Sequence, residues 1–105
     1  MKEITVQELK NLKDANEDFQ LIDCREPHEA EICSIGGELI PMGELPNHIE
    51  QIAKDKKVII HCRSGARSGK MVDYLEATFG LKNLYNLKGG ILAYANEIDN
   101  SLTIY

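Results

Sequence analysis

Short apolar runs alternate with segments of helical periodicity along nearly the whole chain, and this alternation limits the possible folds more than any other feature. Four runs have the length and the apolar or β-branched content of buried strands, namely residues 19–24, 37–40, 57–62 and 83–87. Strands that alternate with helices form parallel sheets with helices on both faces. The sequence therefore predicts an α/β fold.

The predicted helices carry recognisable end signals. Thr5 and Glu8 have the spacing of a capping box in front of an apolar stripe. Proline lies near the start of "EPHEAEIC", which indicates a short helix there, and Gly80 follows the last residue of another helical pattern. Further helical spacing covers residues 45–52, 66–79 and 89–98.

Size and composition indicate one ordinary globular domain over residues 1–105, with 43% hydrophobic and 28% charged residues. The net charge of −5 argues against a nucleic-acid partner. No apolar run approaches the roughly 18 residues of a membrane span, so we expect no membrane partner and a cytoplasmic location. For the oligomeric state, a monomer is the plain expectation. The three cysteines form no C-x-x-C pair, so we expect free thiols and neither metal nor cofactor.

Charge is distributed unevenly along the chain. Residues 1–53 contain 4 basic and 12 acidic residues, whereas residues 54–70 contain 6 basic and 1 acidic residue. The basic segment surrounds Cys62, which follows the clearest predicted strand. A basic window in an acidic protein indicates a small anionic ligand near that cysteine.

The segment "CRSGARS" lies between the 57–62 strand and a helix predicted to begin near Ala66 or Arg67. Gly65 permits the backbone conformations that turn N–H groups inward, and the start of the helix adds its positive dipole end. Both effects favour the thiolate of Cys62 over the thiol. The sequence therefore predicts a nucleophilic cysteine with a lowered pKa.

Side chains of the same loop extend this prediction. Arg63 and Arg67 supply positive charge that would bind an anion, and Ser64 and Ser68 supply hydroxyl donors for the thiolate or its adduct. The alternative interpretation is a buried structural cysteine beside a solvated basic loop.

Asp23 and Arg25 end the 19–24 run, and the carboxyl ends of parallel strands meet at one edge of the sheet. We expect this pair beside the cysteine loop. Asp23 would orient Arg25 or satisfy local N–H groups, and the second, structural role is favoured. As a ligand for the anion, Arg25 ranks behind the two loop arginines.

Four segments, in order, resemble the signatures of the rhodanese-like (sulfurtransferase) family in its single-domain form: "LIDCREPHEAE", "IPMGEL", "CRSGARS" and "NLKGGILAY". The resemblance covers nearly the whole chain. It implies a three-layer α/β domain with a five-stranded parallel sheet, and a Cys62 that accepts sulfane sulfur as a persulfide. Thiosulfate or a persulfide would be the donor, and cyanide or a thiol the acceptor. A cysteine desulfurase or a sulfur-carrier protein would be a suitable partner.

The chain departs from the family pattern at "CSIGGE", where many members have Gly-His-Ile-Pro-Gly-Ala. Cys33 replaces the usual glycine and Ser34 replaces the histidine. Any contribution of that histidine to the site is therefore absent. Because the cysteine loop itself is intact, we expect sulfur transfer to be retained.

Two other functions remain as alternatives. Phosphatases and arsenate reductases of a related type have five residues between cysteine and arginine, whereas Cys62 and Arg67 are separated by four. The shorter loop favours a single sulfur atom over a tetrahedral phosphate. A non-catalytic binding module with the same fold is the other alternative, although such modules often lack the cysteine.

The remaining chemically interesting side chains are interpreted as structural. His61 precedes Cys62 in a strand, so the two side chains face opposite ways and the histidine is expected to be packed. Cys24 is expected to be buried and Cys33 to lie nearer the surface. The alternative for both cysteines is that they act as resolving thiols for Cys62.

Overall fold

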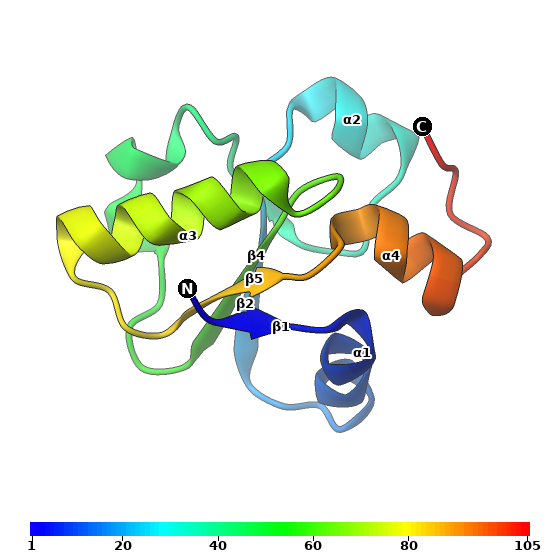
Figure 1. The fold of residues 1–105 in the computed structure, drawn as a ribbon, viewed down its shortest axis with the longest axis horizontal. Coiled ribbons are helices and arrows are strands. Elements are labelled where there is room, and N and C mark those ends of the chain that lie inside the picture. Colours follow the sequence, from blue (N-terminus) through cyan, green and yellow to red (C-terminus); the bar gives the residue numbers. More distant parts are fainter.

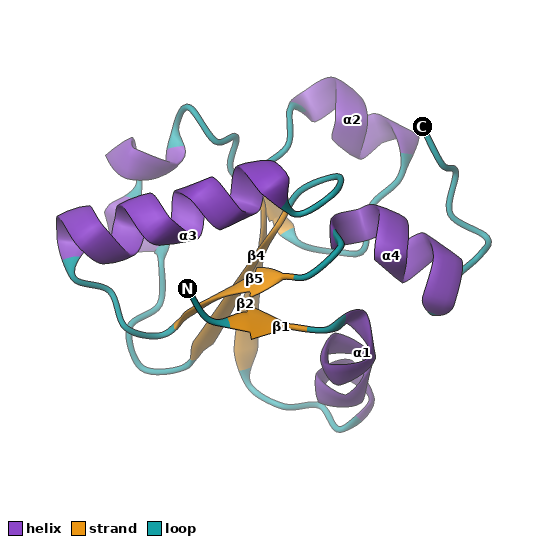
Figure 2. Ribbon diagram, in the orientation of Figure 1, coloured by secondary structure: helices purple, strands orange, loops and turns teal.

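A computed structural model describes residues 1–105 and confirms the predicted α/β fold with a five-stranded parallel sheet (Figures 1 and 2). The strands are β1 (Glu3–Ile4), β2 (Phe19–Asp23), β3 (Glu38–Leu39), β4 (Lys57–His61) and β5 (Leu84–Leu87). Their order in the sheet is β1-β5-β4-β2-β3, with every neighbouring pair parallel. The helices are α1 (Val6–Asp14), α2 (Pro27–Ile32), α3 (Ala66–Phe79) and α4 (Gly90–Glu97).

Two apolar clusters, one on each face of the sheet, hold the three layers together. Side chains of β2, β4 and β5 that include Val58 and Ile60 pack with Met71 and Leu75 of α3. Alternate side chains of the same strands, such as Ile59, pack on the other face with residues of α1 and α4. Figure 1 shows α3 on one side of the sheet, with α1 and α4 together on the other. The central strands are therefore buried on both faces, which explains their continuous apolar runs.

Most predicted helix ends are confirmed. Thr5 caps α1, and its hydroxyl accepts from the Glu8 N–H while the Glu8 carboxylate accepts from the Thr5 N–H. Gly80 ends α3 in the left-handed region, at φ +68°. No helix is long and apolar enough to span a bilayer.

One prediction about secondary structure is wrong, and one strand was not predicted. Residues 45–52 form two 3₁₀ turns, Leu45–Asn47 and Ile49–Gln51, because His48 between them leaves the helical region (φ −127°, ψ 36°). The apolar spacing still has a purpose, since Leu45 and Ile52 are both buried. The strand β1 was not predicted from periodicity, because its two residues are too few to show an alternating pattern.

The carboxyl ends of β2, β4 and β5 meet at one edge of the sheet. The loops that follow these strands lead into α2, α3 and α4 respectively. Figure 2 shows the loop between β4 and α3 close to the start of α4. Cys62 is the first residue of that loop, so the fold places it where parallel sheets present their functional side chains.

Candidate active site

The loop after β4 wraps around the sulfur of Cys62. The Sγ atom accepts hydrogen bonds from the N–H of Gly65 at 3.1 Å, the N–H of Ser68 at 3.4 Å and the hydroxyl of Ser68 at 3.3 Å. Gly65 caps α3 at φ +97°, and a Cβ there would lie 3.3 Å from Leu87 O. The loop therefore needs glycine at this position both for its backbone conformation and for its packing.

These donors control the charge of the sulfur. Burial raises the pKa of Cys62, but the Ser68 hydroxyl and the N–H groups of Ser68, Gly65 and Ser64 outweigh burial. The pKa of Cys62 therefore lies below that of an ordinary thiol, in the direction that the sequence predicts. The Ser64 side chain is exposed and only its N–H group acts on the sulfur, whereas the buried Ser68 contributes through both side chain and backbone.

Asn86 of β5 positions Ser68 and was not predicted as a site residue. Its Oδ1 atom lies 2.5 Å from the Ser68 hydroxyl, and its amide nitrogen donates to Gly65 O at 3.1 Å. Because a hydroxyl has one proton, Ser68 donates either to Asn86 or to Cys62 at a given moment. Asn86 thus holds Gly65 and Ser68, the two residues that donate hydrogen bonds to the sulfur of Cys62.

The start of α4 holds the loop from its outer side. The N–H groups of Ile91 and Leu92 donate to the carbonyl oxygens of Cys62 and Arg63, at 3.0 and 3.1 Å. A Cβ on Gly90 would lie 2.5 Å from Arg63 O, so only glycine permits this approach. With these carbonyls bound on the outside, the loop keeps its N–H groups for the sulfur.

Arg67 was predicted to bind an anion, and in the structure it is paired with Glu29 of α2. Two parallel hydrogen bonds of 2.8 Å join its guanidinium to the Glu29 carboxylate. The Arg67 side chain, with 37% of its area exposed, still reaches the surface. Arg67 lowers the pKa of Glu29 to about 2, so the pair is charged at neutral pH.

Arg63, the other predicted anion ligand, is turned toward Tyr105. Its Nε atom donates to the main-chain oxygen of Tyr105 at 2.6 Å, and a second bond from its terminal nitrogen reaches the same oxygen. The guanidinium also lies 5.0 Å from the centre of the Tyr105 ring. Arg63 therefore contributes positive charge beside the loop while two of the five N–H donors of its guanidinium are used within the protein.

Asp23 and Arg25 form a buried ion pair, so Asp23 orients Arg25, and its carboxylate also accepts from the Arg25 N–H at 3.1 Å, which is the local role that was favoured. The Arg25 side chain is 0% exposed and donates to Asp23 through Nε at 2.9 Å and through a terminal nitrogen at 2.7 Å. It also donates to Cys33 O at 2.7 Å and to the Tyr105 hydroxyl at 3.0 Å. Arg25 therefore fastens the turn after β2 to the end of α2 and has no free face for a substrate.

The three remaining residues of interest lie where the sequence predicts. His61 is fully buried on the opposite face from Cys62, and burial lowers its pKa, so it is neutral. Its Nε2 atom has no hydrogen-bond partner and lies 3.9 Å from Asp23. Cys24 is buried and Cys33 half-buried, and both are free thiols.

A groove of about 690 Å³ opens beside the cysteine loop. Its wall consists of Glu26, Met42, Gly43, Pro46, Arg67, Lys70, Met71 and Tyr74. Met42, Pro46 and Met71 give the groove apolar surface, and its two basic residues, Arg67 and Lys70, outnumber its one acidic residue, Glu26, so the groove suits an anion with an apolar part. Cys62 itself is only 1% exposed, so only a small reactive group reaches its sulfur.

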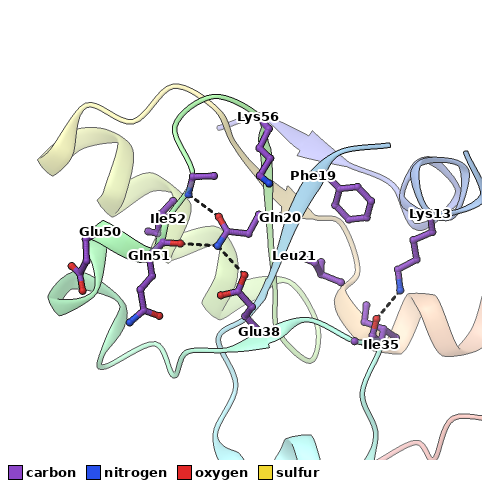
Figure 3. Close-up of a pocket in the computed structure, with 12 residues that line it drawn as sticks. Lys13, Phe19, Gln20, Leu21, Ile35, Glu38, Glu50, Gln51, Ile52 and Lys56 are labelled. Carbon is purple, nitrogen blue, oxygen red and sulfur yellow. Dashed lines mark hydrogen bonds between the residues drawn. The ribbon is translucent and has the colours of Figure 1, made fainter. Parts of the chain in front are cut away.

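A second groove, of about 640 Å³, lies away from the loop, and none of residues 62–68 lines it (Figure 3). The Gln20 amide crosses it, donating to Glu38 at 3.0 Å and to Gln51 O at 2.7 Å and accepting from the Ala53 N–H at 2.8 Å. These bonds tie the 3₁₀ segment and β3 to β2. The hydrogen bonds of Gln20 in this groove thus stabilise the fold.

Comparison with known proteins points to one family. The family model described as the rhodanese-like domain matches residues 5–97. YtwF of Bacillus subtilis, which is named as a sulfurtransferase, and a sulfurtransferase of Allochromatium vinosum are each 38% identical to this chain over 98 residues. The alignments cover 92% of this chain and 93% and 91% of the two relatives.

Two further similarities extend over all of this chain. A rhodanese-like/PpiC domain-containing protein of Arabidopsis thaliana is 34% identical, but the chain spans only 38% of that protein. The crystal structure of a rhodanese-like domain protein from Staphylococcus aureus superposes with a TM-score of 0.82 at 34% identity, and 99% of that chain is covered.

Proposed function

The chain belongs to the rhodanese-like domain family, and we propose that it is a sulfurtransferase that carries sulfane sulfur on Cys62 as a persulfide. Relatives of nearly the same length are named sulfurtransferases, which supports this class of activity. The observation that carries the proposal is the set of three hydrogen bonds from Gly65 and Ser68 to the Cys62 sulfur. They stabilise a thiolate before the reaction and an anionic persulfide after it.

The reaction takes place in two displacements at sulfur. The Cys62 thiolate attacks the outer sulfur of thiosulfate or of another persulfide, and sulfite or a thiolate leaves with the electron pair of the broken S–S bond. An acceptor such as cyanide or a thiolate then attacks the outer sulfur, which regenerates the Cys62 thiolate. No base is required once the thiolate has formed, which agrees with the buried, neutral His61.

The surroundings of the loop support an anionic donor. Arg67 and Lys70 line the groove beside the loop, and Arg63, which follows Cys62 directly, adds a third positive charge to the loop. The four residues between Cys62 and Arg67 leave space for one sulfur atom near the N–H groups. A small anion such as thiosulfate, or a persulfide delivered by a cysteine desulfurase or a sulfur-carrier protein, would meet these requirements.

Intact-mass analysis tests the proposal. The protein is incubated with thiosulfate or glutathione persulfide, and we expect an adduct of about 32 Da, one sulfur atom, on Cys62. Dithiothreitol should remove the adduct, and Cys62→Ala should not form it. Absence of the adduct with both donors, or turnover of an aryl phosphate alone, would overturn the proposal.

A further inference from the structure

Cys24 and Cys62 occupy equivalent positions at the ends of neighbouring parallel strands. In the register of β2 and β4, Asp23 lies opposite His61. The ladder continues one residue further, because the Cys24 N–H donates to His61 O at 3.0 Å. In a parallel ladder that bond places Cys24 directly opposite Cys62.

The two side chains also share a face of the sheet. Cys24 and Cys62 both belong to the apolar cluster beneath α3, together with Ile22 and Ile60 of the same strands. Neighbouring strands lie about 4.8 Å apart, which falls within the Cα–Cα range of about 4.4–6.8 Å found for disulfides. The strand spacing therefore satisfies the Cα–Cα requirement for a disulfide between Cys24 and Cys62.

We propose that Cys24 is a resolving thiol that closes an intramolecular disulfide with Cys62 after a peroxide has oxidised Cys62. In the first step the Cys62 thiolate attacks hydrogen peroxide, which forms a sulfenic acid and releases hydroxide. In the second step the Cys24 sulfur attacks the sulfenic sulfur, and the S–O bond breaks. The Cys24 proton leaves with the departing oxygen as water, so two thiols and one peroxide give one disulfide and two waters.

The surroundings of Cys24 keep it out of the sulfur-transfer cycle. Burial raises the pKa of Cys24 to about 12, and the negative charges of Cys62 and Asp23 add to the effect. A persulfide on Cys62 is anionic and preserves this repulsion, so Cys24 stays protonated and leaves the persulfide intact. A sulfenic acid is neutral and removes the contribution of Cys62, which makes Cys24 a better nucleophile when oxidation has occurred.

Cys33 provides a matched control within the same chain. It follows α2, packs against the apolar cluster on the opposite face of the sheet, and is more exposed than Cys24. Its exposure makes it easier for peroxide to reach, but its position keeps it from the Cys62 sulfur. If position decides which thiol resolves Cys62, Cys24 reacts and Cys33 does not.

Disulfide mapping of the peroxide-treated protein tests the proposal. The wild type and the Cys33→Ala variant are treated with a small excess of hydrogen peroxide, blocked with an alkylating reagent, and digested without reduction. Both should give a peptide pair joined through Cys24 and Cys62. Before alkylation, the intact monomer should weigh 2 Da less than the reduced protein, because disulfide formation removes two hydrogens. Dithiothreitol should restore alkylation of Cys62.

The Cys24→Ala and Cys24→Ser variants should show the opposite behaviour. Without a resolving thiol, Cys62 should proceed to sulfinic acid, which dithiothreitol does not reverse, and the irreversible fraction should be several-fold higher than in the wild type. Equal irreversible oxidation in all proteins, or a disulfide to Cys33 or to a second molecule, would overturn the proposal. The mapping needs no sulfur donor, so its result is independent of the sulfurtransferase proposal.

Discussion

Glu29 of α2 holds Arg67 of the cysteine loop through two parallel hydrogen bonds of 2.8 Å. The pair connects residues separated by 38 positions and joins the helix after β2 to the helix after β4. Its consequence is that one of the charges lining the groove, that of Arg67, is held in position by a partner. Since only two of its five N–H donors are bonded to Glu29, Arg67 keeps further donors for an anion in the groove that it lines.

The Glu29–Arg67 pair should make stability depend on pH in the acidic range. The pKa of Glu29 is lowered to about 2 from its ordinary value of 4.5, so its contribution is complete above pH 4.5 and is lost as pH falls toward 2. After allowance for the exposed Arg67, we expect the contribution to be about 1–2 kcal/mol. Urea unfolding at several pH values should show this loss in the wild type, and Glu29→Gln should abolish it. An unchanged acid profile in Glu29→Gln would contradict the prediction.

Ser68→Ala should raise the pKa of Cys62, because the hydroxyl is the largest of the contributions that stabilise the thiolate. The rate of alkylation by iodoacetamide, followed against pH, should shift to higher pH and fall several-fold at neutral pH. Ser64→Ala is the control, since it keeps the N–H group and removes only an exposed hydroxyl. Identical profiles for the two variants would show that the Ser68 hydroxyl is donated mainly to Asn86.

Gly90→Ala should displace the cysteine loop, because Gly90 packs against the outer side of that loop at Arg63. The new methyl group would lie 2.5 Å from Arg63 O, at a backbone φ of +60° that disfavours alanine. We expect a loss of about 1–3 kcal/mol in unfolding free energy, together with slower alkylation of Cys62. Gly43→Ala meets no atom within 4 Å and should leave both measurements unchanged.

Asp23→Asn should be the most destabilising of these changes, because it leaves the fully buried Arg25 without its counter-charge. Breaking a buried pair from one side costs about 3–5 kcal/mol. Asp14→Asn removes the partner of Lys10 in an exposed pair and should change the midpoint of thermal unfolding very little. Thermal unfolding of both variants measures the contrast, and similar losses in the two would show that Arg25 finds another acceptor.

The parts of the fold that depend on local sequence were predictable. Capping at Thr5, the αL residue Gly80 and the apolar runs of the central strands each result from neighbouring residues, so a single stretch of sequence reveals them. The loop residues Gly65 and Ser68 were identified for the same reason. β1 was missed because its two residues pair with β5 only after the chain has folded back on itself.

The supporting residues of the site were not predicted, although Glu29 and Asn86 lie within the family signatures "LIDCREPHEAE" and "NLKGGILAY". Asn86, Glu29 and Tyr105 contact the loop or its arginines from 18, 38 and 42 positions away in the sequence. No spacing or periodicity connects them with Cys62, and each has a side chain that is common on protein surfaces. Only the folded arrangement of α2, β5 and the segment after α4 around the loop brings them together.

The bonds from Ile91 and Leu92 to the carbonyl oxygens of the loop have a consequence for the newly made chain. A ribosome synthesises Cys62 almost thirty residues before these two donors, and further residues must be added before both have left the exit tunnel. Until α4 docks, the loop carbonyls have no partner on their outer side and the N–H groups are not committed to the sulfur. We therefore expect the growing polypeptide to carry an ordinary, weakly reactive thiol, which becomes a nucleophile only after α4 has emerged and docked.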